Sequence, residues 1–312
     1  MYRPIIIRPK SHEEWLEERK KGIGASEVGA IIGVSPFDSP FSLFLKKTGQ
    51  VPPEPENEAM LMGHLLEDAV AKRWEIETGK KVIKASAADI IYVHPQYDYM
   101  RVTPDRIVKG RKKLLECKTT ALPVDEDNLP PHWVAQVIYQ QYVTGIHDAD
   151  IAWLESGRRF GYANIPYDEE FAEFIAHRVA EFWNDSVLGG KEPDAISVAD
   201  LAVKIPRSTP EKSIEADADA IDQINVLREK KAIYDALGDE IAELQNSLKM
   251  FMSDSEAIVD ENGTVLLTWK SGKDKTSFDS KRFAEENPDL YDKYCKTVPG
   301  SRSFLLKKLK QQ

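Results

Sequence analysis

The stretch LLECKTT, residues 114–120, decides which fold we predict for the middle of this sequence. Side chains alternate across a β-strand, so Glu116 and Lys118 should point to one face and Cys117 to the other. Asp105 precedes Glu116 by eleven residues, in the segment RVTPDRIV. Two opposite charges on one strand face form either a solvated ion pair or half of an active site. The rest of the chain has to distinguish these two interpretations.

Composition limits the possible classes of protein. The chain has 312 residues, 42% of them hydrophobic and 30% charged, which suffices for one large or two moderate domains around a core. A formal charge of −10 excludes a uniformly basic nucleic-acid-binding surface but not a local basic groove. Two cysteines, Cys117 and Cys295, exclude a disulfide framework and an iron–sulfur cluster. With no membrane-length apolar run and no signal-peptide pattern, we expect a cytoplasmic protein.

Hydrophobic periodicity and turn residues predict a group of strands between helices. Helices are expected at residues 11–20, 39–49, 57–78, 132–145 and 168–190. Strands are expected within residues 81–94, 99–108, 113–120, 148–156 and 159–167. In the third helix, an apolar stripe is expected along Leu61, Leu65, Ala69 and Trp74.

The character of the sequence changes near residue 190. Residues 190–220 have little periodicity and are expected to form a linker, and a long charged helix follows over residues 221–252. Its apolar residues step by four, three, four and three, which is typical of a short coiled-coil seam: Leu237, Ile241, Leu244, Leu248 and Phe251. A β-hairpin with a turn near Asn262–Gly263 comes next. The long helix either packs within its own chain or serves assembly or the docking of a partner.

Three carboxylates and a lysine carry the chemical signal. Carboxylates grouped in a cleft bind Mg²⁺, which prefers oxygen ligands. Asp105, Glu116 and, in the helix GHLLEDAV, Glu67 supply such oxygens, while Lys118 can orient an attacking water or stabilise charge on a phosphate. Pro-Asp, ten intervening residues and Glu-x-Lys form the pattern PD-(D/E)xK. The pattern alone also fits a turn followed by an exposed strand.

Four motifs in order make the interpretation specific. The run RKKGIGASEVGAIIGVSPFDSPFSLFLKKTG is followed by GHLLEDAV, by TPDRIV with LLECKTT, and by HWVAQVIYQQYVTG. Together they resemble the YqaJ-type viral recombinase family, relatives of phage lambda exonuclease with a PD-(D/E)xK core. The resemblance implies an α/β fold of the α+β type, with a restriction-endonuclease-like central mixed β-sheet flanked by helices. Residues 1–205 would be the exonuclease domain. Residues 206–312 would be a C-terminal region with a long helix and a small hairpin, for oligomerisation or partner docking.

The same resemblance implies residue roles at the metal site. Asp105 and Glu116 would be the core metal ligands, the backbone carbonyl of Cys117 a further ligand, and Glu67 the helix carboxylate near the metal. The catalytic lysine would be Lys118. Gln136 and, one helical turn later, Gln140 complete the set. Gln136 matches the glutamine of the last family motif, whereas Gln140 only shares its helix and therefore ranks second.

The N-terminal motif suggests an anchor for a 5′-phosphate. Ser26 is expected to cap a helix whose free N–H groups attract anions. Gly24 would let the backbone approach a phosphate closely. Arg19 stands where the family carries its phosphate-binding arginine. The alternative is that this motif is only a turn and a helix cap.

The resemblance implies Mg²⁺-dependent digestion of linear duplex DNA from the 5′ end, with Mn²⁺ as a substitute metal. The product would be a 3′ single strand for a single-strand annealing protein of the RecT/Bet type, in a phage or prophage recombination system. The expected partners are double-stranded DNA ends and further copies of the chain, since the resemblance implies a homo-oligomer such as the rings formed by relatives of lambda exonuclease. No membrane is expected. Two alternatives stay open: an endonuclease on the same metal site, and a non-catalytic protein that binds DNA ends.

Overall fold

The computed structural model describes residues 2–52, 55, 57–84, 90–110, 112–298, 300 and 302–307. The chain forms two compact units, Met1–Ile205 and Pro206–Gln312. Among the described residues, none of the helices combines the length and the apolar character needed to cross a membrane.

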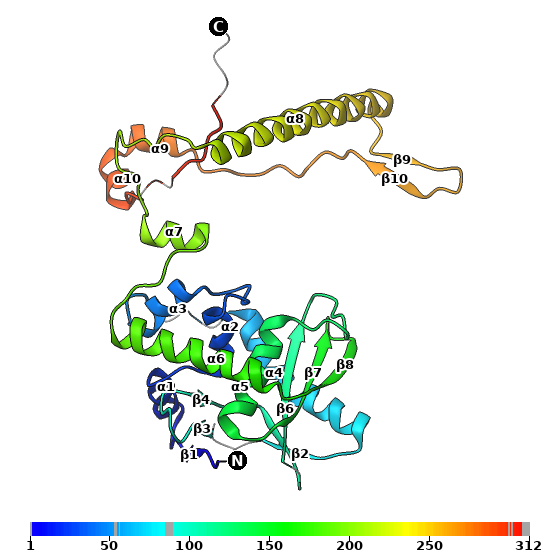
Figure 1. Ribbon diagram of the computed structural model, residues 1–312. Helices are drawn as coiled ribbons and strands as arrows, with labels where there is room; N and C mark the ends of the chain where they lie inside the picture. The colour runs from blue at the N-terminus through cyan, green and yellow to red at the C-terminus, as the bar shows by residue number, and fades with distance from the viewer. Residues whose placement is uncertain are drawn as a thin grey trace. The chain divides into compact units, whose positions relative to one another are not determined.

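A five-stranded mixed sheet is the centre of the first unit (Figure 1). Its strands follow the order β2 (Val82–Lys84), β5 (Arg106–Val108), β6 (Lys113–Thr120), β7 (Asp148–Glu155) and β8 (Arg159–Ile165). β6 and β7 are parallel, and the other neighbouring pairs are antiparallel. The mixed sheet predicted from the sequence is thereby confirmed.

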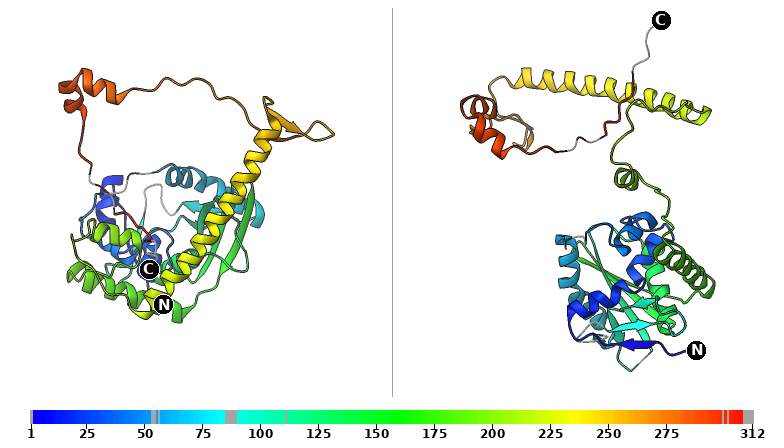
Figure 2. Two further views of the ribbon diagram at one scale, coloured as in Figure 1. Left: turned by 90° about the horizontal axis from the view of Figure 1, so that it is seen from above. Right: turned by 90° about the vertical axis from the view of Figure 1, so that its left-hand side faces the viewer.

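Helices cover both faces of this sheet (Figures 1 and 2). On one face, α4 (Glu58–Thr78) packs Val70, Ala71 and Trp74 against Leu115 of β6. On the other, α5 (Pro131–Thr144) connects β6 to β7 and packs with α6 (Glu169–Glu181) in the larger core. A π-helical turn, Phe182–Leu188, extends α6. Parallel neighbours need such a crossover helix, so α5 is fixed against the sheet by the topology itself.

A smaller sheet joins the N-terminus to the region before the site. β1 (Ile5–Ile7), β3 (Ile91–Val93) and β4 (Arg101–Val102) pair antiparallel in the order β1-β3-β4. The segment 81–94, for which strand structure was expected, contributes two strands, β2 and β3, which belong to different sheets. The middle of that segment, residues 85–89, lies outside the described residues.

The N-terminal helices form as the capping residues indicate. They are α1 (His12–Lys20), α2 (Val28–Ile31) and α3 (Pro40–Lys47). Ser11 and Ser39 accept hydrogen bonds from the backbone N–H groups of Glu14 and Ser42, which satisfies donors at each helix start. A 3₁₀ turn, η1 (Ala25–Glu27), comes directly before α2.

The apolar stripe expected on α4 is wrong in its first half. Leu61, Leu65 and also Ala69 are exposed, and of the predicted stripe only Trp74 is buried, beside Val70 and Ala71. The sheet meets only the C-terminal half of α4, so the buried face is set by the position of the sheet rather than by the periodicity of the whole helix. Gly79, with φ of +67°, then ends the helix as expected.

The region expected to be a plain linker contains a helix. α7 (Val198–Lys204) begins at Ser197, whose side chain accepts from the N–H of Asp200. The Asp200 carboxylate is buried and accepts a hydrogen bond of 2.7 Å from Ser39 Oγ at the start of α3. This contact attaches α7 to the first unit. The helix was not predicted from the sequence because α7 is short and its apolar residues remain exposed.

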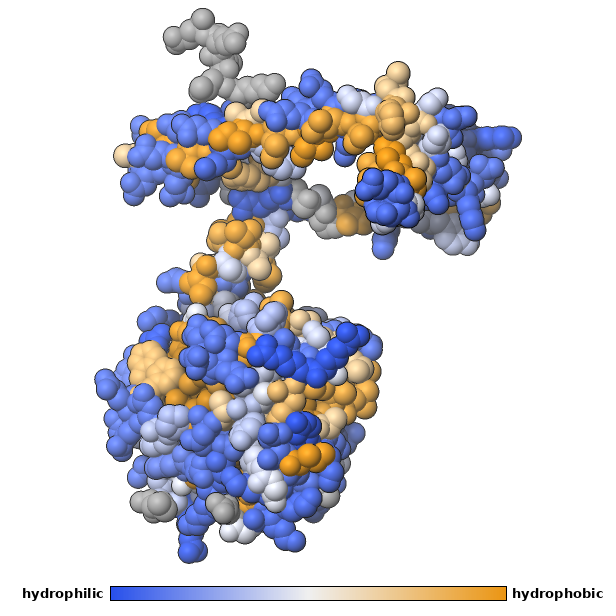
Figure 3. All heavy atoms as spheres, turned by 90° about the vertical axis from the view of Figure 1, so that its right-hand side faces the viewer, coloured by the Kyte–Doolittle hydropathy of each residue, from blue (hydrophilic) through white to orange (hydrophobic). Residues whose placement is uncertain are grey.

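The second unit is built around α8 (Ala218–Met252), which confirms the long helix predicted there. The predicted hairpin is also present, as β9 (Ala257–Val259) and β10 (Val265–Thr268). Two short helices, α9 (Ser280–Glu286) and α10 (Pro288–Tyr294), were not predicted. Apolar side chains form a band on the surface of this unit (Figure 3).

Glu75 on α4 allows a test of the contact between α4 and β2. Its carboxylate accepts from the Val82 N–H at 3.0 Å and lies 3.1 Å from Lys81 Nζ and from Lys72 Nζ. The Val82 N–H, followed by the two lysines, lowers the pKa of Glu75 from 4.5 to about 2. Glu75→Gln should therefore lower the free energy of unfolding at pH 7 by about 1–2 kcal/mol.

The pH dependence of that loss has a definite sign. A lowered folded-state pKa stabilises the protein above the unfolded-state pKa, and the contribution disappears as the pH falls through the folded-state value. The difference between wild type and Glu75→Gln should thus shrink from pH 4.5 toward pH 2, as measured by urea unfolding with tryptophan fluorescence. Glu77→Gln is the control, because its exposed pair with Arg73 contributes little. Equal losses in both variants at every pH would contradict this account.

Candidate active site

Glu116 is the centre of a polar network between β6 and α5. Lys118 Nζ donates to Glu116 Oε1 at 2.7 Å and to Gln136 Oε1 at 2.8 Å. Gln136 Nε2 donates to Glu116 Oε1 at 2.5 Å, and Gln140 Nε2 donates to Glu116 Oε2 at 2.8 Å. The Glu116 side chain is almost fully buried. Both of its oxygens are therefore fixed by named donors.

Local geometry explains why these four side chains meet. Glu116 and Lys118 lie two residues apart on β6 and share the face that α5 covers. Gln136 and Gln140 lie one turn apart on α5 and share the helix face toward that strand. Cys117 points the opposite way, into the core beneath α4. The structure thus brings together the strand residues and both glutamines of the predicted site.

Asp105 approaches the same strand from its open edge. It precedes β5 directly, and its Oδ2 accepts from the Cys117 N–H at 2.8 Å. The ladder between β5 and β6 stops at the pair Arg106–Leu115, so this edge of Cys117 has no strand neighbour. The N–H and C=O groups of one strand residue point to the same edge. The Cys117 carbonyl is therefore directed to the side where Asp105 lies.

The electrostatics of Asp105 reflect crowded carboxylates. Burial raises its pKa well above the usual range, and the negative charges of Glu116 and Glu67 raise it further. Lys118 and the Cys117 N–H act in the opposite direction but do not compensate. The negative charge around Asp105 therefore exceeds what Lys118 balances, which is the condition that a bound cation relieves.

Glu67 is held by an arginine that the sequence analysis missed. The buried guanidinium of Arg106 binds Glu67 and Asp68 of α4 and donates to the backbone oxygen of Asp105 at 2.6 Å. One side chain therefore connects α4 to the segment that presents Asp105. The signal was present in the sequence, because Arg106 alternates with the apolar residue Val108 on a short strand and so points to the same buried face.

A cleft of about 850 Å³ joins the N-terminal motif to the carboxylates. Arg19, Gly24 and Ser26 line one part of it, and Glu67, Asp105 and Gln136 line another. His12, Trp15, Met60, Ile90 and Arg101 are among the other lining residues. The two groups of residues singled out from separate sequence motifs therefore face one space.

Ser26 does not cap a helix, and that expectation is wrong. Gly24 occupies the cap position of the 3₁₀ turn, and the side chain of Glu27 accepts from its N–H at 2.7 Å. Ser26 lies inside the turn and lines the cleft. The following helix α2 has only four residues, so its dipole is small. Any affinity for a phosphate at this position has to come from side chains more than from the helix.

Arg19 and the glycine-containing loop are fixed by surrounding contacts. The Arg19 guanidinium lies over the ring of Trp15, 4.7 Å from the ring centre. The buried Lys47 Nζ donates to the Gly22 oxygen at 2.6 Å and pairs with Glu27 at 2.8 Å. Since Glu27 also holds Gly24, Lys47 and Glu27 together determine the path of the loop.

The donor set fits a hard divalent cation. Asp105, Glu116 and the Cys117 carbonyl supply oxygen atoms near one strand end, and the raised pKa of Asp105 marks unbalanced negative charge there. Within the described ranges, no three His, Cys, Asp or Glu side chains are already arranged around a common point. Glu67 is engaged by Arg106, and Glu116 by its three donors. Binding of a cation would therefore require one of these carboxylates to exchange a partner.

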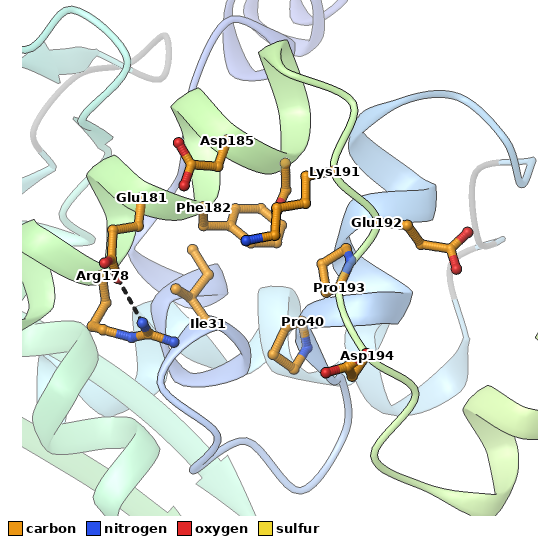
Figure 4. A pocket seen from close by; sticks show the side chains of 11 residues that line it. Ile31, Pro40, Arg178, Glu181, Phe182, Asp185, Lys191, Glu192, Pro193 and Asp194 are labelled. Atoms are coloured by element: carbon orange, nitrogen blue, oxygen red, sulfur yellow. Dashed lines mark hydrogen bonds and ion pairs between the residues drawn. The ribbon is translucent and has the colours of Figure 1, made fainter.

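A second cavity, of about 280 Å³, lies beside the end of α6 (Figure 4). Arg178 pairs with Glu181 at its wall, and Lys191 and Asp185 extend over it. Its lining mixes both charge signs with Ile31, Pro40 and Phe182. Among the described residues that line it, none belongs to the predicted site, so the first cleft is the candidate site.

Comparison with known proteins identifies the family. The model of the YqaJ-like viral recombinase domain matches residues 14–147, which include every predicted site residue. The uncharacterized protein YqaJ of Bacillus subtilis (strain 168) is 36% identical over 300 residues, covering 92% of this chain and 91% of that protein. The chain belongs to the YqaJ-like viral recombinase family. The resemblance noted in the sequence motifs is confirmed, and the similarity to YqaJ extends through the second unit.

Three solved structures that are described as exonucleases show some similarity to this chain. The alkaline exonuclease LHK-Exo of Laribacter hongkongensis has a TM-score of 0.46 and 21% identity, covering 55% of this chain and 91% of its own. A phage-related exonuclease of Haemophilus somnus 129PT has a TM-score of 0.41 and 14% identity, covering 55% of this chain and 96% of its own. A putative exonuclease of Eubacterium rectale has a TM-score of 0.44 and 13% identity, covering 66% of this chain and 96% of its own.

Gly22 allows a test of the loop geometry. A Cβ atom at Gly22 would lie 2.2 Å from the backbone oxygen of Tyr99, which also accepts from the Ile23 N–H at 2.7 Å. Gly22→Ala should therefore displace the loop and lower the free energy of unfolding by about 1–3 kcal/mol. Gly63→Ala is the matched control. Gly63 lies within α4, the nearest atom to its added Cβ is Thr119 Oγ1 of β6 at 3.8 Å, and removing a helix glycine should stabilise by about 0.5–1 kcal/mol. Urea unfolding measures both, and an unchanged Gly22→Ala would contradict the tight packing.

Proposed function

We propose that this chain is a Mg²⁺-dependent exonuclease that digests linear double-stranded DNA from the 5′ end. The observation that carries the proposal is the shared cleft: Arg19 and Ser26 line it together with Asp105, Glu67 and Gln136. A site for a terminal phosphate beside a carboxylate site suits an enzyme that starts at DNA ends. Membership of a recombinase family supports the same conclusion, because recombination by annealing consumes the 3′ single strands that such digestion leaves.

In this proposal, Asp105, Glu116 and the Cys117 carbonyl hold the metal, with Glu67 close by. A bound Mg²⁺ would lower the pKa of the attacking water and neutralise charge on the phosphate, and Mn²⁺ would substitute. The chain's own contribution is to keep these oxygens in place. Gln136 and Gln140 orient the Glu116 carboxylate through hydrogen bonds of 2.5 Å and 2.8 Å.

Lys118 acts in this scheme as a cation. Burial alone would lower its pKa, but Glu116 and Asp105 outweigh burial, and the pKa is raised. The ammonium group therefore stays protonated at neutral pH. It suits stabilisation of the negative charge that develops on the phosphate oxygens better than removal of a proton from water.

Arg19, Ser26 and Gly24 form the proposed anchor for the 5′-phosphate. The arginine lies over Trp15, which keeps its guanidinium at the cleft wall. An arginine binds phosphate through paired N–H donors, and such contacts fix the register without reading sequence. The released 3′ strand would pass to a single-strand annealing protein.

The first test compares two DNA substrates. A linear, 5′-phosphorylated duplex and a closed circular plasmid are incubated with the full chain and Mg²⁺, with the linear strands end-labelled in turn. We expect loss of the linear duplex from its 5′ ends and an intact circle. Nicking of the circle would show an endonuclease instead. Digestion of neither would show a protein that only binds ends.

Lys118→Ala should reduce the rate of digestion by at least about a thousandfold, because the cation beside the reacting phosphate is lost. Binding of duplex ends, measured by fluorescence anisotropy, should change little. Lys112→Ala is the control, since this exposed lysine lies just before β6 and is not one of the donors to Glu116. Turnover retained in Lys118→Ala would remove Lys118 from the mechanism.

Arg19→Ala should weaken digestion of 5′-phosphorylated ends by about tenfold to a hundredfold, the loss expected for one charge-assisted contact of about 1.5–3 kcal/mol. Ends with a 5′-hydroxyl should be affected much less. Lys20→Ala is the matched control, because this exposed neighbour pairs with Glu17. Equal slowing of both kinds of end in Arg19→Ala would show that the anchor lies elsewhere.

A further inference from the structure

The second unit leaves a long apolar helix face without an internal partner. Along α8, Tyr234, Leu244 and Phe251 are 74%, 66% and 78% exposed, and Leu237 and Ile241 are about half exposed. Of the described side chains of α8, only Met252 is buried. Exposed apolar surface of this extent on a soluble protein marks an interaction site.

The remaining elements of the unit are too short to cover this face. The helices α9 and α10 have 7 residues each, whereas α8 has 35. The hairpin of β9 and β10 has strands of 3 and 4 residues. A partner that matches α8 along its length therefore has to be another helix of similar length.

The apolar face has the periodicity of a two-helix seam. The expected seam from Leu237 to Phe251 continues backward through Tyr234 and Lys230 to Leu227 with the same alternation of three and four residues. Lys230 is the single charged side chain among these seam positions. The residue that faces Lys230 across the seam therefore distinguishes a parallel from an antiparallel pair of helices.

Charge is concentrated in two short segments on either side of the middle of α8. Segment 228–231 carries three basic residues and Glu229, and segment 239–243 carries three acidic residues and no basic one. Asp219 and Asp222 precede the basic segment, and Lys249 follows the acidic one. A parallel pair of identical helices would place each basic segment beside its copy, with Lys230 facing Lys230. An antiparallel pair places the basic segment of each helix beside the acidic segment of the other.

The antiparallel register pairs apolar residues near the middle of the helix. With Tyr234 facing Leu237, Leu227 faces Leu244 and Lys230 faces Ile241 of the second helix. Toward the ends, Leu248 and Phe251 face Gln223 and Ala220. Glu240 then lies next to Lys230 across the seam. A twofold axis at the middle of the helix repeats every one of these contacts.

We propose that α8 pairs antiparallel with α8 of a second copy of this chain. The pairing joins two copies through the second unit, separately from the proposed nuclease site in the first. Its failure would leave the proposed nuclease function untouched, and an inactive nuclease would leave the pairing testable.

The decisive experiment is a carbodiimide cross-link on the unmodified chain, which joins an amine to a carboxylate only in direct contact. Equal amounts of unlabelled and ¹⁵N-labelled protein are mixed, and cross-linked peptides are analysed by mass spectrometry. Lys230 and Glu240 lie roughly 15 Å apart along one helix, too far for a link within a chain. We expect mixed-isotope peptides that join Lys230 to Glu240. Their absence overturns the proposal, whether the chains are single or joined in another way.

Charge reversal gives an independent test by sedimentation equilibrium. Lys230→Glu and Glu240→Lys should each weaken the self-association by about tenfold, because the twofold axis repeats each new repulsion. The double variant Lys230→Glu/Glu240→Lys should restore it. Lys212→Glu, the same charge change before α8, is the control and should have no effect. Single variants that equal wild type, or a double variant weaker than both, would overturn the antiparallel register. A wild type that stays a monomer would overturn the pairing itself.

Discussion

The buried carboxylate of Glu116 is the constraint on which the first unit depends. A charge removed from water is tolerated only when neighbouring groups compensate it. Lys118 supplies the opposite charge and the two α5 glutamines supply further hydrogen bonds. These donors come from the strand itself and from the helix that follows it. The packing of α5 against β6 therefore also supplies hydrogen bonds to the Glu116 carboxylate, and a change in that packing would alter these hydrogen bonds.

Much of this arrangement could be predicted from the sequence, because it follows from short-range periodicity. Two-residue alternation placed Glu116 and Lys118 on one face, and helical spacing placed Gln136 and Gln140 together. The motif order then indicated Asp105 as the neighbour of that strand. The long helix α8 and the hairpin after it were equally accessible, since an uninterrupted helical pattern and an Asn–Gly turn are local signals.

What the sequence did not predict depends on contacts between distant segments. The sequence around Ser26 resembles a helix cap, but in the structure Gly24 holds the cap position and its N–H donates to the Glu27 carboxylate. The partnership of Arg106 with Glu67 spans separate elements and carries no pattern of its own. β2 and β3 belong to different sheets because β2 pairs with β5, whereas β3 pairs with β1 and β4. Periodicity reports which face of an element is apolar, but not which neighbour will cover it.

The exposed N-terminal half of α4 has a consequence for how the cleft works. Met60, His64 and Glu67 line that cleft, yet the apolar side chains that pack α4 on the sheet begin only at Val70, and the ion pairs with Arg106 begin only at Glu67. Local opening requires least free energy where few apolar contacts are broken. Opening of the cleft at the part of α4 before Glu67 would therefore cost less free energy than any opening that breaks the contacts of Glu116.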